Sequence, residues 1–151
     1  MKIYIITGAP NTHKSSVIRA LTGVRNSATF NVQFLSGIFK THVMITSCNE
    51  IRYKQFPNGI SQEQLIQIIQ SLPPSVEVVM IALRSSRPVN GIGAEVYIER
   101  LNQAGYEIMP VVMFNDTITL PTNVQGVVLP SNKSIPSNLT ASKIRKIWAI
   151  V

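Results

Sequence analysis

A run of small, polar and basic residues near the start of the chain carries its clearest chemical pattern. It reads Gly8-Ala9-Pro10-Asn11-Thr12-His13-Lys14-Ser15-Ser16. Gly8, Lys14 and Ser15 have the spacing of the phosphate-binding loop G-x-x-x-x-G-K-[ST], and His13 stands where that pattern has its second glycine. Backbone N–H groups of such a loop surround phosphate oxygens, and a helix beginning there adds the positive end of its dipole. We therefore predict that residues 8–16 bind phosphate groups.

Two side chains of this loop have the chemistry to act on a bound phosphate. Lys14 supplies a cation for the outer phosphates and is the residue that we expect to serve catalysis. The Ser15 hydroxyl can ligate a magnesium ion. A histidine at position 13 requires an allowed backbone angle, and we expect its ring to point away from the phosphates.

A buried strand precedes the loop and a helix follows it, so the chain resembles the P-loop nucleoside-triphosphatase superfamily. The resemblance implies that ATP or GTP binds together with Mg²⁺. It implies that residues 8–15 surround the phosphates, that Lys14 neutralises them, and that Ser15 contacts the metal. His13 departs from the family pattern.

Within the superfamily, the order of elements resembles the Ras-like GTPases, which also follow the phosphate loop with a helix and a hairpin. Their guanine-reading motif is Asn-Lys-x-Asp, and Asn115-Asp116 stand in its place without the lysine. By this resemblance, Asn115 and Asp116 contact the nucleotide. Ser131-Asn132-Lys133 occupies the place of the last base-contacting motif. The aspartate and glycine expected after the hairpin are missing, because residues 46–50 read Thr-Ser-Cys-Asn-Glu.

The acidic residues that phosphoryl transfer needs are scarce. The chain has one aspartate and six glutamates, and only Glu50 and Asp116 are predicted near the carboxyl ends of strands. Transfer requires a magnesium ion held opposite the serine and a group that orients the nucleophile. We therefore expect a nucleoside-triphosphate-binding protein with weak or slow phosphohydrolase activity, or a non-catalytic nucleotide-binding module.

Two other functions remain open. One is a small kinase, in which Arg84 and Arg87 contact the transferring phosphate, because guanidinium groups match phosphate geometry. The other is a nucleic-acid-binding protein that uses the loop for phosphates. His42 in a strand and Cys48 after it are expected to have structural roles.

Hydrophobic patterns predict the elements that must position these residues. Strands are expected at 2–7, on both sides of Ser36-Gly37 within 28–47, and at 76–83, 108–114 and 124–130. Helices are expected at 14–22, from Ser61 to Pro73, from Ala94 to Gly105, and from Ser137 or Asn138 to the end.

Strands that alternate with helices pair in parallel, so residues 1–151 are predicted to form one α/β domain. Its architecture is a P-loop NTPase-like three-layer sandwich with a largely parallel sheet, and strand 2–7 lies centrally. Ligands of such sheets bind beyond the carboxyl ends of the strands. The loops of interest therefore begin at Gly8, Ser47, Arg84, Asn115 and Ser131.

The composition narrows the range of partners and compartments. Lys and Arg number 14 against 7 Asp and Glu, a net charge of +7, which favours nucleic acid or an acidic protein surface. An apolar content of 45% is enough for a sizeable core and excludes a disordered chain.

Cys48 is the single cysteine, which excludes an intrachain disulfide framework and indicates a cytoplasmic protein. No apolar run approaches the roughly 20 residues that cross a bilayer, so no membrane partner is expected.

Overall fold

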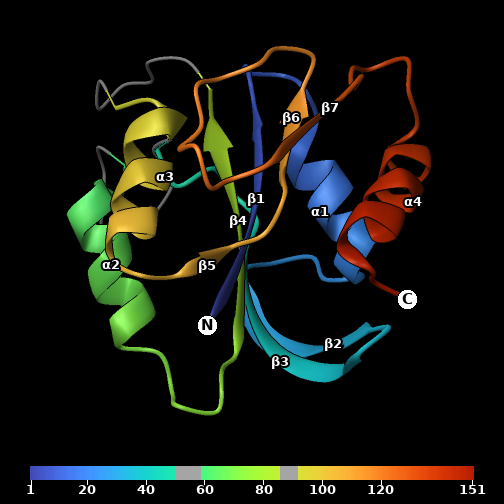
Figure 1. Ribbon diagram of the computed structural model, residues 1–151. Helices are drawn as coiled ribbons and strands as arrows, with labels where there is room; N and C mark the ends of the chain where they lie inside the picture. Colours follow the sequence, from blue (N-terminus) through green and yellow to red (C-terminus); the bar gives the residue numbers. More distant parts are fainter. Residues whose placement is uncertain (50–58, 86–91) are drawn as a thin grey trace.

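The computed structural model describes residues 1–49, 59–85 and 92–151, which form an α/β fold around one mostly parallel sheet (Figure 1). Along the chain the elements are β1 (Lys2–Gly8), α1 (Lys14–Thr22), β2 (Ala28–Phe34), β3 (Gly37–Met44), α2 (Gln62–Gln70), β4 (Val78–Arg84), α3 (Ala94–Gln103), β5 (Glu107–Ile108), β6 (Val111–Phe114), β7 (Gly126–Leu129) and α4 (Ser137–Trp148).

The first strand lies inside the sheet, as the sequence predicts. The strand order is β2-β3-β4-β1-β6-β7, and the short β5 pairs with the beginning of β1. The hairpin of β2 and β3 is antiparallel, whereas β3, β4, β1, β6 and β7 run parallel. In the register of β1 and β4, Gly8 lies opposite Arg84. The last residues of several strands therefore meet at one edge.

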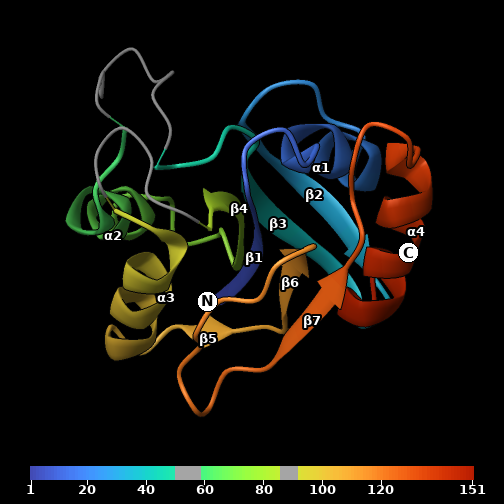
Figure 2. The ribbon, with the colours of Figure 1, turned by 90° about the horizontal axis from the view of Figure 1, so that it is seen from above.

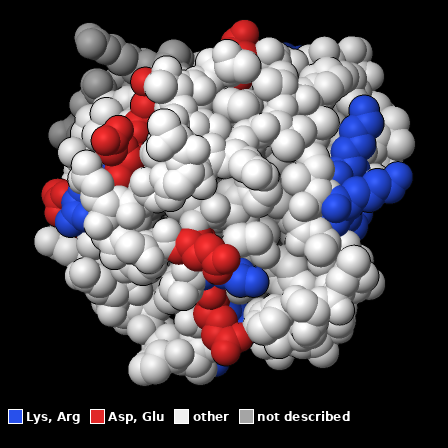
Figure 3. Space-filling model, viewed as in Figure 1, with Lys and Arg blue, Asp and Glu red and all other residues white. Residues whose placement is uncertain are grey.

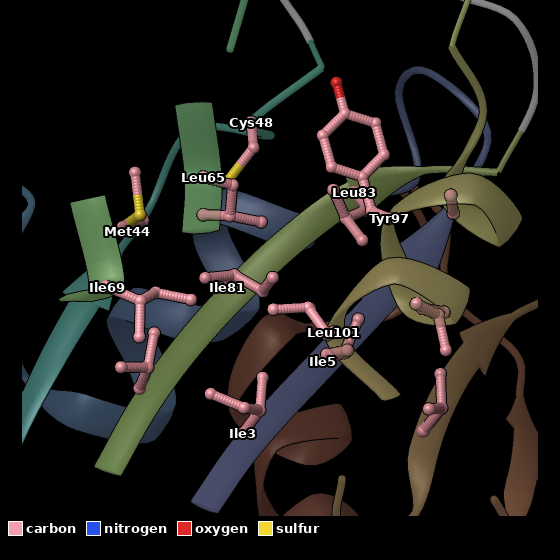
Figure 4. Packing of buried hydrophobic residues seen from close by; sticks show 14 of the residues in the cluster. Ile3, Ile5, Met44, Cys48, Leu65, Ile69, Ile81, Leu83, Tyr97 and Leu101 are labelled. Atoms are coloured by element: carbon pink, nitrogen blue, oxygen red, sulfur yellow. The ribbon is translucent and has the colours of Figure 1, made fainter. Parts of the chain in front are cut away.

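Helices cover both faces of the sheet, so the described residues form three layers (Figure 2). Tyr4 and Ile6 of β1 face α1 and α4, while Ile3 and Ile5 face α2 and α3. Figure 4 shows the second of these interfaces, where Leu65 and Ile69 of α2 pack over the sheet. Because β1 is buried on both faces, its sequence is continuously apolar from Ile3 to Ile6 rather than alternating.

Local signals account for most of the element boundaries. Ser61 and Gln64 form a reciprocal capping box at the start of α2. The strand expected at 108–114 is divided into β5 and β6 around Met109-Pro110, because proline has no N–H with which to continue the ladder.

The final helix, α4, packs Ile144 and Trp148 on the sheet, and it ends at Trp148 rather than at the end of the chain as expected. The Trp148 side chain is 3% exposed, and its indole N–H donates to the Pro110 carbonyl at 2.7 Å. Among the residues that the structure describes, no helix has the length and apolarity to cross a membrane.

We predict that His42 makes folding stability depend on pH. The Nδ1 atom of His42 lies 2.8 Å from the Thr29 hydroxyl across the hairpin, and burial lowers the pKa of its imidazole. At pH values between the folded and unfolded pKa, the unfolded chain therefore binds the extra proton. The free energy of unfolding should fall as the pH drops below about 6.5.

Urea denaturation of wild type and His42→Gln between about pH 7.5 and about pH 5 measures this effect. As the pH falls, the free energy of unfolding of wild type should decrease more than that of the His42→Gln variant. A difference that stays constant over this range would contradict the prediction.

Candidate functional site

A pocket of about 260 Å³ opens at the carboxyl edge of the sheet. It is lined by Pro10, Asn11, His13, Lys14, Ser15, Ser16, Ser47 and Arg84. The connection from β1 leads to α1 on one face of the sheet, whereas that from β4 leads to α3 on the other. Open α/β sheets bind ligands where adjacent connections diverge in this way. The topology therefore favours this pocket as the functional site.

The Lys14 side chain is folded into the loop that precedes it. Its ammonium donates to the carbonyl oxygens of Gly8 at 3.1 Å and Ala9 at 2.9 Å, and the residue is only 6% exposed. The Thr12 hydroxyl donates to the same Ala9 carbonyl at 2.8 Å. The loop thus holds a cation in the wall of the pocket, in a fixed position that a bound anion can approach.

The first turn of α1 adds backbone donors to the same wall. The first intrahelical bond runs from the Val17 N–H to the His13 carbonyl, so the N–H groups of residues 14–16 precede the helical ladder. The first turn contains no acidic residue, and His13 makes no side-chain capping bond. The positive end of the helix dipole is therefore not offset by a side chain of its own helix.

His13 adopts the backbone conformation that favours glycine. Its φ and ψ are 65° and 30°, in the left-handed region, and Asn11 has a φ of 63°. Glycine occupies this region without steric cost, whereas a residue with a Cβ is disfavoured there. A glycine at position 13 would therefore adopt this conformation without steric cost. In this chain the histidine retains the glycine-like backbone.

Gly8 lies so close to Thr12 and Phe114 that a side chain would not fit at this position. A Cβ at this position would lie 2.6 Å from the Thr12 hydroxyl oxygen and 3.0 Å from the Cβ of Phe114. Both distances are shorter than ordinary van der Waals contact. The end of β1 can therefore turn tightly beside β6 only without a side chain.

Ser15 is oriented by the end of the neighbouring hairpin. Its hydroxyl donates to the Ile45 carbonyl at 3.0 Å, which leaves the lone pairs of its oxygen available to a metal. Within residues 1–49, 59–85 and 92–151, no group of three or more His, Cys, Asp or Glu residues could hold a metal ion. A magnesium ion here would take its other ligands from phosphates and water, as Mg²⁺ commonly does.

The buried side chain of Asn49 joins the ends of β3 and β4. Its Oδ1 accepts from the Arg84 N–H at 2.8 Å, and its Nδ2 donates to the carbonyls of Arg84 and Ile92, both at 3.0 Å. Asn49 therefore fixes the backbone from which Arg84 reaches the pocket.

Asn115 has the corresponding position between β6 and β7. Its Nδ2 donates to the Ser131 carbonyl at 2.8 Å, and its Oδ1 accepts from the Ser131 N–H at 3.0 Å. The Ser131 hydroxyl in turn donates to the Thr12 carbonyl at 2.6 Å. Asn115 thus connects the ends of β6 and β7 to the loop at 8–16.

The structure brings only some of the predicted site residues together. Residues 10, 11, 13–16 and 84 line the pocket, and Gly8, Ala9 and Thr12 shape the loop behind it. Asn115 and Asp116 do not line it, and the Asn115 amide is engaged by Ser131. Base recognition by these two residues stays a prediction. Glu50 and Arg87 lie outside the described residues.

The sequence placed Ser47 and Ser131 at the starts of loops of interest, and Ser131 in the position of a base-contacting motif, but it predicted no role for Asn49. The hydrogen bonds of Asn49 to Arg84 and of Ser131 to Thr12 were not predicted, and their only signal in the sequence is the position of these residues after predicted strands. The neighbouring Cys48 is fully buried, and burial raises the pKa of its thiol to about 12. A thiol that stays protonated is a poor nucleophile, which supports the structural role expected of Cys48.

Comparisons of this chain with family models, with curated proteins and with solved structures find no match.

We predict that Asn49→Ala lowers the free energy of unfolding by about 2 to 3 kcal/mol, because it leaves the buried Arg84 N–H without its acceptor. Asn49→Asp should be at least as harmful, since a carboxylate would face two carbonyl oxygens. Chemical denaturation measures both effects. Asn31→Ala, at an exposed position of β2, is the matched control and should cost less than about 0.5 kcal/mol. Equal stability of the Asn49→Ala and Asn31→Ala variants would contradict the assigned role.

Proposed function

We propose that this chain binds a nucleoside triphosphate, ATP or GTP, with Mg²⁺ at the loop formed by residues 8–16. The position of Lys14 carries the proposal, because its ammonium is held by the Gly8 and Ala9 carbonyls in the wall of a pocket. A phosphate in that pocket would meet this cation and the N–H groups of the first turn of α1. The glycine-like backbone of His13 supports the same assignment.

Arg84 supports the proposal from a different element. It ends β4 and lines the pocket together with Lys14 of α1, so basic residues from two elements contribute to the pocket wall. A guanidinium can make two parallel hydrogen bonds to a phosphate, whereas an ammonium acts as a point charge. In the proposed complex, Lys14 and Arg84 both contact the outer phosphates.

The proposed activity is slow hydrolysis or binding alone. The described residues that line the pocket include no carboxylate, and Asp116 does not reach it. Among these described residues, the serine hydroxyl is the group that could contact the metal, and solvent would supply its remaining ligands. This observation favours a non-catalytic nucleotide-binding module as the second candidate function.

The proposal extends to the fold family and the compartment. We infer a P-loop NTPase-like domain because the loop joins a central parallel strand to a helix at the carboxyl edge of the sheet. A cytoplasmic location would supply the nucleotide and would suit the buried, protonated thiol of Cys48.

We predict that Lys14→Met weakens ATP and GTP binding about 10- to 100-fold, the magnitude of a lost charge-assisted hydrogen bond. Methionine keeps an unbranched apolar chain in this buried position, and circular dichroism verifies that the variant folds. Titration calorimetry with Mg²⁺ measures the affinity. Lys40→Met, at an exposed position of β3, is the control and should bind as wild type does. Unchanged affinity in a folded Lys14→Met variant would refute nucleotide binding by this loop.

We predict that His13→Gly strengthens nucleotide binding several-fold. The substitution removes a side chain from a left-handed position, so the loop can adopt its phosphate-binding geometry without strain. Calorimetry at several values between about pH 5.5 and about pH 8 tests whether the imidazole takes part. Weaker binding by the variant, together with loss of a pH dependence present in wild type, would show instead that His13 contacts the phosphates.

A further inference from the structure

The acidic residues of this chain are confined to one internal stretch of the sequence. Residues 1–49 and 117–151 contain no aspartate or glutamate and carry nine Lys and Arg residues. Residues 50–116 contain all seven acidic residues and five Lys and Arg residues. Two parts of the chain that are distant in sequence thus share one sign of charge.

The fold brings these two parts together on one side of the sheet. Helix α1 comes from the first acid-free segment and α4 from the second, and they lie side by side on the same face (Figure 2). The helices on the opposite face, α2 and α3, carry Glu63, Glu95 and Glu99. Figure 3 shows basic side chains gathered over α4, and most of the acidic ones away from it.

Six basic residues form the surface that we call the basic face. They are Arg19 of α1, Arg25 and Lys133 of adjoining loops, and Lys143, Arg145 and Lys146 of α4. All are exposed except Arg145, which is half-buried and donates to the Ala20 carbonyl at 2.8 Å, joining the two helices. The helix dipole favours basic residues near the C-terminal end of a helix. It does not explain why residues 1–49 and 117–151 contain no acidic residue at all.

We propose that the basic face binds the phosphate backbone of double-stranded nucleic acid without reading its sequence. Lysine, arginine, serine and asparagine are the side chains that commonly contact phosphates. On α4, the exposed surface around Lys143 and Lys146 includes Asn138 and Ser142. Cations and short polar groups are thus combined along one helix.

Two observations favour a duplex over other polyanionic partners. The one tryptophan, Trp148, is buried against the sheet, so α1 and α4 offer no exposed aromatic ring on which single-stranded bases could stack. Leu139, at 54% exposure, is the one large apolar side chain that these helices expose. A membrane-binding helix would need a larger apolar surface, and protein interfaces are typically enriched in aromatic residues and methionine, of which α1 and α4 expose none.

This inference does not depend on nucleotide binding at the loop. Lys143 and Lys146 lie in the second half of α4, whereas the pocket lies at the carboxyl edge of the sheet, where the loop before α4 begins. Lys14→Met should therefore leave duplex binding unchanged, and Lys143→Glu should leave ATP binding unchanged. Failure of one proposal would not remove the other.

The test measures binding of a fluorescently labelled DNA duplex of about 20 base pairs by anisotropy, at several salt concentrations. Within the described parts of the chain, the side chains of Lys143 and Lys146 are exposed and make no hydrogen bond or ion pair, so Lys143→Glu and Lys146→Glu should fold normally. Each should weaken binding about tenfold and reduce the slope of log K against log salt by about one to two. Lys40→Glu on β3 changes the net charge equally but lies off the basic face. It should weaken binding less than about twofold.

Competition identifies the partner. Unlabelled duplex should displace the probe better than a single strand of equal length, phosphatidylserine vesicles or polyglutamate. Equal losses in Lys40→Glu and Lys143→Glu would overturn the proposal, because they would reduce it to an effect of net charge. Binding to the vesicles or to polyglutamate in preference to the duplex would overturn it as well.

Discussion

Seven residues of β1 pair in parallel with β4, from Lys2 opposite Val78 to Gly8 opposite Arg84. The pairing continues past the strands, because the Ser85 N–H donates to the Gly8 carbonyl at 3.0 Å. This register sets where the loop after β1 begins and which residue of β4 stands beside it. The close packing of Gly8 against Thr12 and Phe114 then turns the loop back over the sheet. The location of Lys14, Ser15 and Arg84 around one pocket follows from these two constraints.

Buried amide side chains connect the other strand ends along the carboxyl edge of the sheet. Asn49 joins the ends of β3 and β4, Asn115 joins those of β6 and β7, and Ser131 connects the latter pair to the loop. Each amide satisfies one backbone donor and at least one backbone acceptor, and the Lys14 ammonium donates to the Gly8 and Ala9 carbonyls at the same edge. This network positions the backbone around the pocket that Lys14 and Arg84 line.

The sheet also separates two layers of different charge. Helices α2 and α3 lie on one side with three of the glutamates, and the basic face lies on the other. The pocket opens where the connections to these layers diverge, so the nucleotide proposed there would lie beside a surface suited to a polyanion. The two proposals therefore describe separate sites that the same topology brings close to each other.

The sequence by itself determined the features that depend on local spacing. The loop at residues 8–16, the capping box at Ser61, and the apolar runs of β1 and β4 are all formed by residues close together in the chain. The division of the strand expected at 108–114 around Pro110 was not predicted. Tertiary structure alone decided the strand order, the engagement of Asn115 by Ser131, and the union of two acid-free segments into one face. Each of these features brings together residues that are distant in the chain. The partner of a buried amide or of a charged side chain then depends on which strands and helices become neighbours in the fold.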